Sequence, residues 1–243
     1  VIGHEIGHFI YAHGLAIASN RNESLEFSIQ QRAQEISADR IGLLASGSLD
    51  HSILAMMKTM SGLTSKYLTF NIGAFLSQLS NTEKFKSQID SNSSHPSILV
   101  RCRALLWFSM SETFKSGEQN YQPNEVAKLN KKIKDDIDKF VDSIARKRIN
   151  TLKKDVALWL CAAKIIEDNA FNSNEQQIFN EMFGQELLDK LKNFLSGHQD
   201  ASSVQKSVSE KLDAAVRNLQ GEIPVSFENE MAVLEKEISS NFV

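Results

Sequence analysis

His4-Glu5-Ile6-Gly7-His8 lies at the start of the chain, and Glu35-Ile36-Ser37-Ala38-Asp39 follows after a segment rich in Asn and Ser. Residues four apart share one face of a helix, so His4 and His8 can present two imidazoles to one metal ion. Glu5 falls on the neighbouring edge, where its carboxylate can take a proton from a metal-bound water. The first stretch therefore predicts a helix with two metal ligands and a general base.

The second stretch offers a third ligand. It lies in a segment whose apolar residues recur at helical spacing, and a catalytic zinc usually takes three protein ligands. Glu35 is the candidate for the third. Asp39, one turn further on, is placed to accept a hydrogen bond from the second ring N–H of His4 or His8. Ala38 would let the two helices approach closely.

A histidine pair at this spacing also occurs on surface helices that bind nothing, and the second stretch favours the metal site. His13 is a rival third ligand. Metzincins place their third histidine six residues after the second motif histidine, with a glycine halfway. Here Tyr11 occupies the glycine position and His13 comes one residue early. We therefore expect His13 to be a polar helix residue near the site.

Three motifs in this order resemble the zinc metallopeptidases that include the CAAX prenyl proteases and the HtpX-like and Oma-type quality-control proteases. The resemblance covers roughly residues 1–110. Its motifs are His4 to His8 with His13, Glu35 to Asp39 with Arg40, and Ser94-His95-Pro96 with Arg101.

The resemblance implies gluzincin-type peptide hydrolysis, with one zinc ion on His4, His8 and Glu35. It also implies that the third motif lies over the cleft, where His95 or Arg101 could stabilise an oxyanion or His95 could close the metal site as a latch. From the residues alone, the same segment indicates a helix start with Arg101 as a solvated side chain.

Members of this family carry upstream β-strands that form the cleft wall. The chain begins at Val1, three residues before His4, so we expect it to be a piece of a longer protein that cleaves poorly by itself. A signal peptide or membrane anchor upstream stays open, and with it a cytoplasmic or a membrane-associated location.

The composition favours a soluble, mainly α protein, because long helices meet few breakers among 11 Gly and 3 Pro in 243 residues. A net charge of -3, with Lys and Arg spread among acids, argues against nucleic acid as a partner. The chain has no run of about 18 apolar residues, which excludes a membrane span within it. Cys102 and Cys161 lie in apolar stretches and are predicted to be core residues.

Two domains are expected. Residues 1–115 form the gluzincin-type core without its upstream strands, 116–123 are a linker, and 124–243 form a helical bundle. Helices are predicted at residues 1–18, 27–46, 49–60, 66–79, 96–114, 124–149 and 155–166, from 174 or 175 onward, and twice between 201 and 243.

About 40 residues of the bundle resemble the TerB-like helical module. Glu167, Asp168 and Glu175 could hold a metal there, although an ordinary surface turn explains such sparse carboxylates better. The bundle has no evident chemistry of its own, so we expect it to regulate the protease, bind a regulatory protein or present substrates.

Three functions stay open at this point. The first is a zinc endopeptidase that acts on a protein or peptide. The second is a zinc hydrolase of other amides or of esters. The third is a non-catalytic helical scaffold that the metal stabilises; an intact Glu5 argues against it, since a structural site has no need of a general base.

Overall fold

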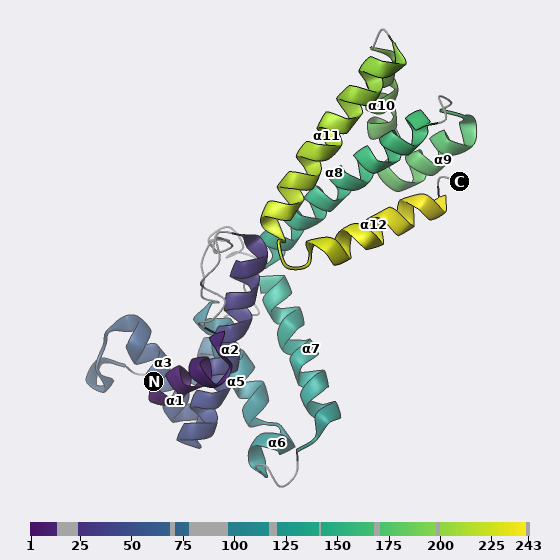
Figure 1. Ribbon diagram of the computed structural model, residues 1–243. Coiled ribbons are helices and arrows are strands. Elements are labelled where there is room, and N and C mark those ends of the chain that lie inside the picture. Colours follow the sequence, from purple (N-terminus) through teal and green to yellow (C-terminus); the bar gives the residue numbers. More distant parts are fainter. Residues whose placement is uncertain are drawn as a thin grey trace. The chain divides into compact units, whose positions relative to one another are not determined.

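The computed structural model forms helices and no strand in the residues that it describes, which confirms the mainly α class. The chain divides into two compact units, Val1–Arg146 and Lys147–Val243. Figure 1 follows their helices along the chain. The described residues are 1–13, 24–68, 71–77, 97–116, 121–140, 142–167, 171–197 and 200–241.

Several helices of the first unit begin at a serine that caps the first turn. Ser24 accepts a hydrogen bond from the Phe27 amide, and Ser48 accepts one from the His51 amide, as expected of N-caps. The unit contains α1 (Ile2–Ile10), α2 (Leu25–Ser46), α3 (Leu49–Ser61), α4 (Ile72–Ser77), α5 (Ile98–Ser109), α6 (Glu112–Lys115), α7 (Pro123–Phe140), the start of α8 (Ser143–Glu167) and a 3-10 turn at Ser65–Tyr67.

The core of the first unit lies between α2, α5 and α7. Apolar side chains from all three helices meet there, and α7 contributes Leu129, Ile133 and Ile137. The division between the units consequently falls after Arg146, whereas the sequence predicted a linker at 116–123. The physical reason is that the apolar stripe of α7 needs a partner, and it packs on α2 and α5.

A buried ion pair also belongs to the first unit. The Arg32 Nε donates a hydrogen bond to the carboxylate of Asp142, and both side chains are almost completely inaccessible. This contact joins α2 to the residue that precedes α8. Removing either partner would leave a buried charge, so the pair strongly favours this one arrangement of the two segments.

Helix α1 crosses α2 at very short range. A Cβ added to Gly7 would lie 2.8 Å from the Ala38 Cα, and one added to Gly3 would lie 2.7 Å from the Ala45 Cβ. The predicted close approach at Ala38 is therefore what the structure has. Small residues on both helices bring the backbone of α1 down onto the face of α2 that carries Glu35 and Asp39.

The second unit is a helical bundle with two clusters of buried side chains. Cys161, Phe179 and Val208 belong to the first cluster, and Val156 and Leu219 belong to the second. Its helices are the rest of α8, α9 (Ser173–Phe183), α10 (Gln185–Ser196), α11 (Ala201–Glu222) and α12 (Phe227–Asn241).

Several predicted helix ends differ from those in the structure. The first helix stops at Ile10 instead of continuing to residue 18, and the predicted 124–149 helix is divided between α7 and α8. Gly184, at φ 88°, separates α9 from α10, a break that the sequence analysis did not identify. Left-handed backbone and tertiary contacts set these ends, and neither has a strong signal in an apolar pattern.

Two further expectations can be compared with the structure. Cys102 and Cys161 are both fully buried and free, as predicted for core residues. Among the described helices, none combines the length and the apolar character that crossing a membrane requires.

Candidate metal centre

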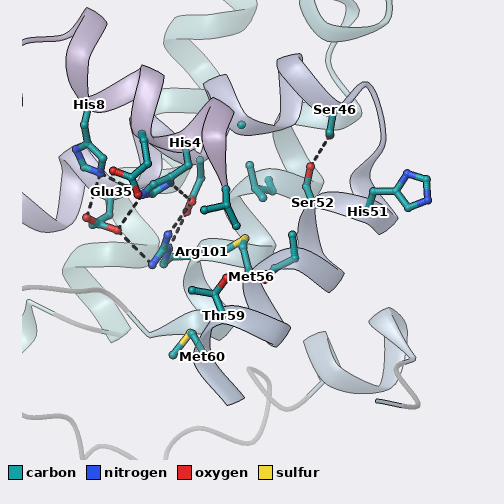
Figure 2. Close-up of a pocket in the computed structure, with 16 residues that line it drawn as sticks. His4, His8, Glu35, Ser46, His51, Ser52, Met56, Thr59, Met60 and Arg101 are labelled. Atoms are coloured by element: carbon teal, nitrogen blue, oxygen red, sulfur yellow. Dashed lines mark hydrogen bonds and ion pairs between the residues drawn. The ribbon is translucent and has the colours of Figure 1, made fainter. Parts of the chain in front are cut away.

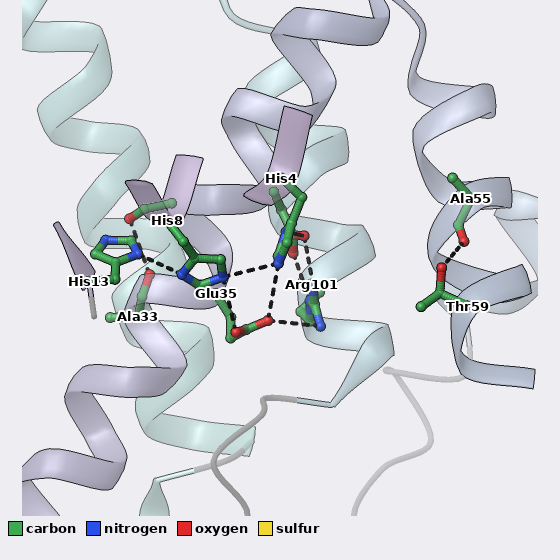
Figure 3. A network of polar contacts seen from close by, with 10 residues as sticks. His4, His8, His13, Ala33, Glu35, Ala55, Thr59 and Arg101 are labelled. Carbon is green, nitrogen blue, oxygen red and sulfur yellow. Dashed lines mark hydrogen bonds and ion pairs between the residues drawn. The ribbon is translucent and has the colours of Figure 1, made fainter. Parts of the chain in front are cut away.

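Three side chains from α1 and α2 converge on one point. The His4 Nε2 lies 3.1 Å from the His8 Nε2 and 3.7 Å from a Glu35 carboxylate oxygen. The other Glu35 oxygen lies 3.3 Å from the His8 Nε2, and Figure 3 shows the three groups facing one another. One ligand atom from each residue can be chosen so that all lie within 4.8 Å of one another.

These separations fit a tetrahedral metal ion. Ligand atoms bonded to zinc at about 2.0–2.1 Å with tetrahedral angles lie about 3.3–3.4 Å from one another. The two Nε2 atoms lie 3.1 Å apart, and the two Glu35 oxygens lie 3.3 Å from the His8 Nε2 and 3.7 Å from the His4 Nε2. With a single Glu35 oxygen, the three ligand atoms lie within 4.8 Å of one another. The donor set, two imidazoles and a carboxylate, is one that catalytic zinc uses. The predicted ligands His4, His8 and Glu35 are thus brought together in a geometry that could hold one such ion.

Asp39 holds the second ring nitrogen of His4. The Nδ1 of His4 lies 2.9 Å from an Asp39 carboxylate oxygen, and the Asp39 side chain is 2% exposed. This hydrogen bond raises the pKa of His4 against the effect of burial. Of the two histidines that the sequence proposed for Asp39, the structure pairs it with His4.

Arg101 of α5 connects the two carboxylates. Its Nε and Nη2 each donate a hydrogen bond of 2.7 Å to Asp39, one to each carboxylate oxygen, and its Nη1 lies 3.2 Å from Glu35. Burial opposes ionisation of Asp39, yet the hydrogen bonds from Arg101 and His4 hold its pKa below the ordinary value. Every nitrogen of the guanidinium faces a carboxylate, so in this structure Arg101 holds Asp39 and Glu35 in position.

The Nδ1 of His8 contacts another histidine, whereas the Nδ1 of His4 contacts a carboxylate. The Nδ1 of His13 lies 2.9 Å from the Nδ1 of His8, and the two ring centroids are 5.0 Å apart. Burial and the neighbouring His8 lower the pKa of His13. His13 is therefore near the site, as predicted, but it follows a turn rather than continuing the helix.

A cavity of about 560 Å³ opens from these residues. Glu5 lines it beside His4 and His8 and is exposed to it, which suits the predicted general base. The opposite wall comes from α3, where Ala55, Met56, Thr59 and Met60 give a surface without charged groups. Met56, Met60 and Arg101 line the same cavity, and Figure 2 shows the ring of His51 pointing away from the ligands.

Two further predicted residues remain to be considered. His95 falls outside the described residues, so its roles as catalytic residue or latch stay predictions. Glu175 belongs to a capping box at the start of α9, in which its carboxylate accepts a hydrogen bond from the Asn172 amide. That pairing favours the surface-turn interpretation over a second metal site.

Comparisons with protein-family models, with curated proteins and with solved structures found no match to this chain. The geometry of the centre therefore has to support any functional assignment by itself. It defines a candidate metal centre of the two-histidine and one-glutamate type on a mainly helical scaffold.

Sequence reasoning missed two relationships in this centre. The motif around His95 singled out Arg101, but nothing in it indicated that the guanidinium contacts Asp39 and Glu35. The sequence placed His13 near the site but did not indicate its contact with His8, because the turn before it uses an alanine where glycine or asparagine is usual.

Proposed function

We propose that this chain is a gluzincin-type zinc endopeptidase, with one zinc ion on His4, His8 and Glu35 and with Glu5 as general base. The observation that carries the proposal is the convergence of three side chains at a point that opens onto a cavity: the two Nε2 atoms lie 3.1 Å apart, and the two oxygens of Glu35 lie 3.3 Å from one and 3.7 Å from the other. A glutamate in that cavity, next to the first ligand, supports catalysis over a purely structural metal.

A bound zinc ion would supply a Lewis acid that polarises a carbonyl and lowers the pKa of a water molecule. The chain's own residues do the rest. Glu5 takes the proton from the attacking water, holds it on its carboxylate and passes it to the leaving nitrogen. Glu5 is exposed and lines the cavity beside His4 and His8, which supports this role.

Arg101 and Asp39 act on the ligands in this proposal. Asp39 fixes the His4 ring with Nε2 toward Glu35, and Arg101 keeps Asp39 ionised while it holds Glu35 in place. Because its nitrogens are engaged with carboxylates, Arg101 is assigned to holding Asp39 and Glu35 rather than to stabilising an oxyanion. Oxyanion stabilisation or closure of the site by His95 stays a prediction.

The test is zinc content measured with peptide hydrolysis in the same preparations. The parent protein, Glu35→Ala and Glu5→Gln would be stripped of adventitious metal, supplied with zinc and analysed by elemental mass spectrometry. Hydrolysis of a mixture of short unstructured peptides would be followed by mass spectrometry, with and without a chelator. Glu112→Gln, at an exposed glutamate of α6, is the matched control.

About one zinc per chain is expected in the parent, in Glu5→Gln and in the control, with a large loss in Glu35→Ala. Hydrolysis should fall about 10²- to 10⁴-fold in Glu5→Gln while its zinc stays bound. A parent without zinc would contradict the metal site. Zinc with equal hydrolysis in Glu5→Gln and the parent would contradict the assigned base.

The same preparations separate the alternatives. Cleavage of model esters or of non-peptide amides, without cleavage of peptides, would favour the broader hydrolase. Zinc that raises the unfolding temperature of a protein inactive on every substrate would favour the scaffold. Binding of a regulatory protein by the second unit stays a prediction.

A further inference from the structure

The chain holds His13 against His8 by an unusual turn. His13 comes five residues after His8, so a continued helix would place it about 140° around the axis from His8. Instead α1 ends at Ile10, and Ala12 adopts φ 52°, a left-handed conformation that side chains with a Cβ rarely take.

The turn brings two aromatic rings into one stack. Tyr11 and His13 lie 5.5 Å apart between ring centroids, with an angle of 19° between their planes. The Ala12 amide donates a hydrogen bond to the Phe9 carbonyl, which closes the end of the helix. Backbone in a sparsely populated region persists only where its surroundings maintain it, and such positions cluster at functional sites.

The turn supplies a hydrogen-bond acceptor that one of the two ligand histidines needs. For both Nε2 atoms to face one ion, each ring has to carry its proton on Nδ1, and each Nδ1–H then needs an acceptor. Asp39 is the acceptor for His4. For His8 the only ring nitrogen of a described residue within 3 Å of Nδ1 is the Nδ1 of His13.

We infer that His13 is a positioning residue whose Nδ1 accepts a hydrogen bond from the His8 Nδ1–H, which fixes the tautomer and orientation of the His8 ring with Nε2 toward Glu35. The inference rests on the metal site proposed above. The two ligand histidines then have different hydrogen-bond acceptors at Nδ1: His4 donates to a buried carboxylate, and His8 donates to a neutral imidazole.

Three substitutions of His13 separate hydrogen bonding from packing. His13→Ala removes both, His13→Phe keeps a ring that can stack on Tyr11 but has no acceptor, and His13→Gln keeps an acceptor. His51→Ala is the matched control, because His51 lines the same cavity but its ring points away from the ligands. The measurement is the zinc dissociation constant, by competition with a chromophoric chelator at one pH.

His13→Ala and His13→Phe are each expected to weaken zinc binding about tenfold, the lower end of what removing a ligand's hydrogen-bond partner does. His13→Gln should stay within about threefold of the parent, and His51→Ala should equal it. Equal affinity in His13→Ala and the parent would overturn the inference. So would an equal loss in all three His13 variants, which would assign His13 a packing role.

Long-range ¹H–¹⁵N spectra of the histidine rings give a readout independent of affinity and activity. With zinc, His8 should carry its proton on Nδ1 in the parent and in His13→Gln. A parent that binds no zinc would refute the proposed function, and metal-free spectra would then decide about His13. His8 ring-nitrogen shifts that are identical in the parent and His13→Ala would refute the contact itself.

Discussion

Arg101 donates two hydrogen bonds of 2.7 Å to the carboxylate of Asp39, a residue 62 positions earlier in the chain. The pair joins α5 to α2 beside the candidate metal centre, and both side chains are largely inaccessible to water. The guanidinium and carboxylate match in the bidentate geometry that gives such pairs their specificity. The packing of the helices and the orientation of His4 therefore depend on the same contact.

Replacing Arg101 should destabilise the first unit. Arg101→Ala leaves the Asp39 carboxylate buried without its main partner, which should lower the free energy of unfolding by about 3 kcal/mol. Arg101→Lys should lose less, because an ammonium retains the charge but not the bidentate geometry. Urea unfolding with a chelator present measures both.

The chain has two tryptophans, Trp107 on α5 in the first unit and Trp159 in the second. In a Trp159→Phe background, the fluorescence of Trp107 therefore reports unfolding of the first unit alone. Lys134→Ala is the control, because its exposed pair with Asp138 should contribute less than about 1 kcal/mol. Equal unfolding midpoints for Arg101→Ala and Lys134→Ala would show that the buried pair contributes nothing beyond a surface contact.

Gly7→Ala should separate α1 from α2. The added methyl group would lie 2.8 Å from the backbone of Ala38, where no flexible side-chain end can move aside. We expect a loss of about 1–3 kcal/mol in the first unit, with weaker zinc binding, because His4 and His8 would be displaced from Glu35. Unfolding followed by Trp107 and zinc titration measure the two effects.

A second glycine provides the opposite result for comparison. A Cβ at Gly221, near the end of α11, would have no neighbour within 4 Å among the described residues. Gly221→Ala should therefore stabilise the second unit by up to about 1 kcal/mol through helix propensity. If Gly7→Ala were as harmless, the close crossing of α1 and α2 would be refuted.

The left-handed turn before His13 makes its own prediction. Ala12→Gly should be neutral or slightly stabilising, because glycine takes φ 52° without the penalty that a Cβ brings. Ala12→Val should disrupt the turn, since a β-branched residue is an outlier there. Nuclear Overhauser contacts between the rings of His8 and His13 should survive the first change and disappear in the second.

The two thiols should be unreactive in the folded protein. Burial raises the pKa of Cys102 and of Cys161 to about 12, and neither side chain is exposed. We expect labelling by a thiol reagent to be slow without denaturant and complete in its presence. Because the two cysteines lie in different units, Arg101→Ala should accelerate labelling of Cys102 and leave Cys161 unchanged; rapid labelling of both in the parent would contradict the packing described.

The sequence was sufficient for those parts of the site that depend on local geometry. Helical spacing by itself puts His4 and His8 on one face and Glu35 one turn from Asp39, since 3.6 residues complete a turn. The long apolar patterns likewise predicted a mainly α protein. The third motif drew attention to Arg101, although its contacts with Asp39 and Glu35 could not be derived from spacing.

Tertiary structure decided the rest, for physical reasons that a linear pattern does not contain. Which histidine Asp39 contacts depends on how α1 lies across α2, and the small residues Gly7 and Ala38 permit that crossing without specifying its angle. The stripe of α7 is equally apolar whether it packs on its own unit or the next. In the structure it packs on α2 and α5, where Arg40 also donates a hydrogen bond to Asn130 and Arg103 pairs with Asp136. His13 reaches His8 because Ala12 takes a left-handed conformation that its residue type disfavours, so the surrounding contacts, rather than local preference, determine that part of the site.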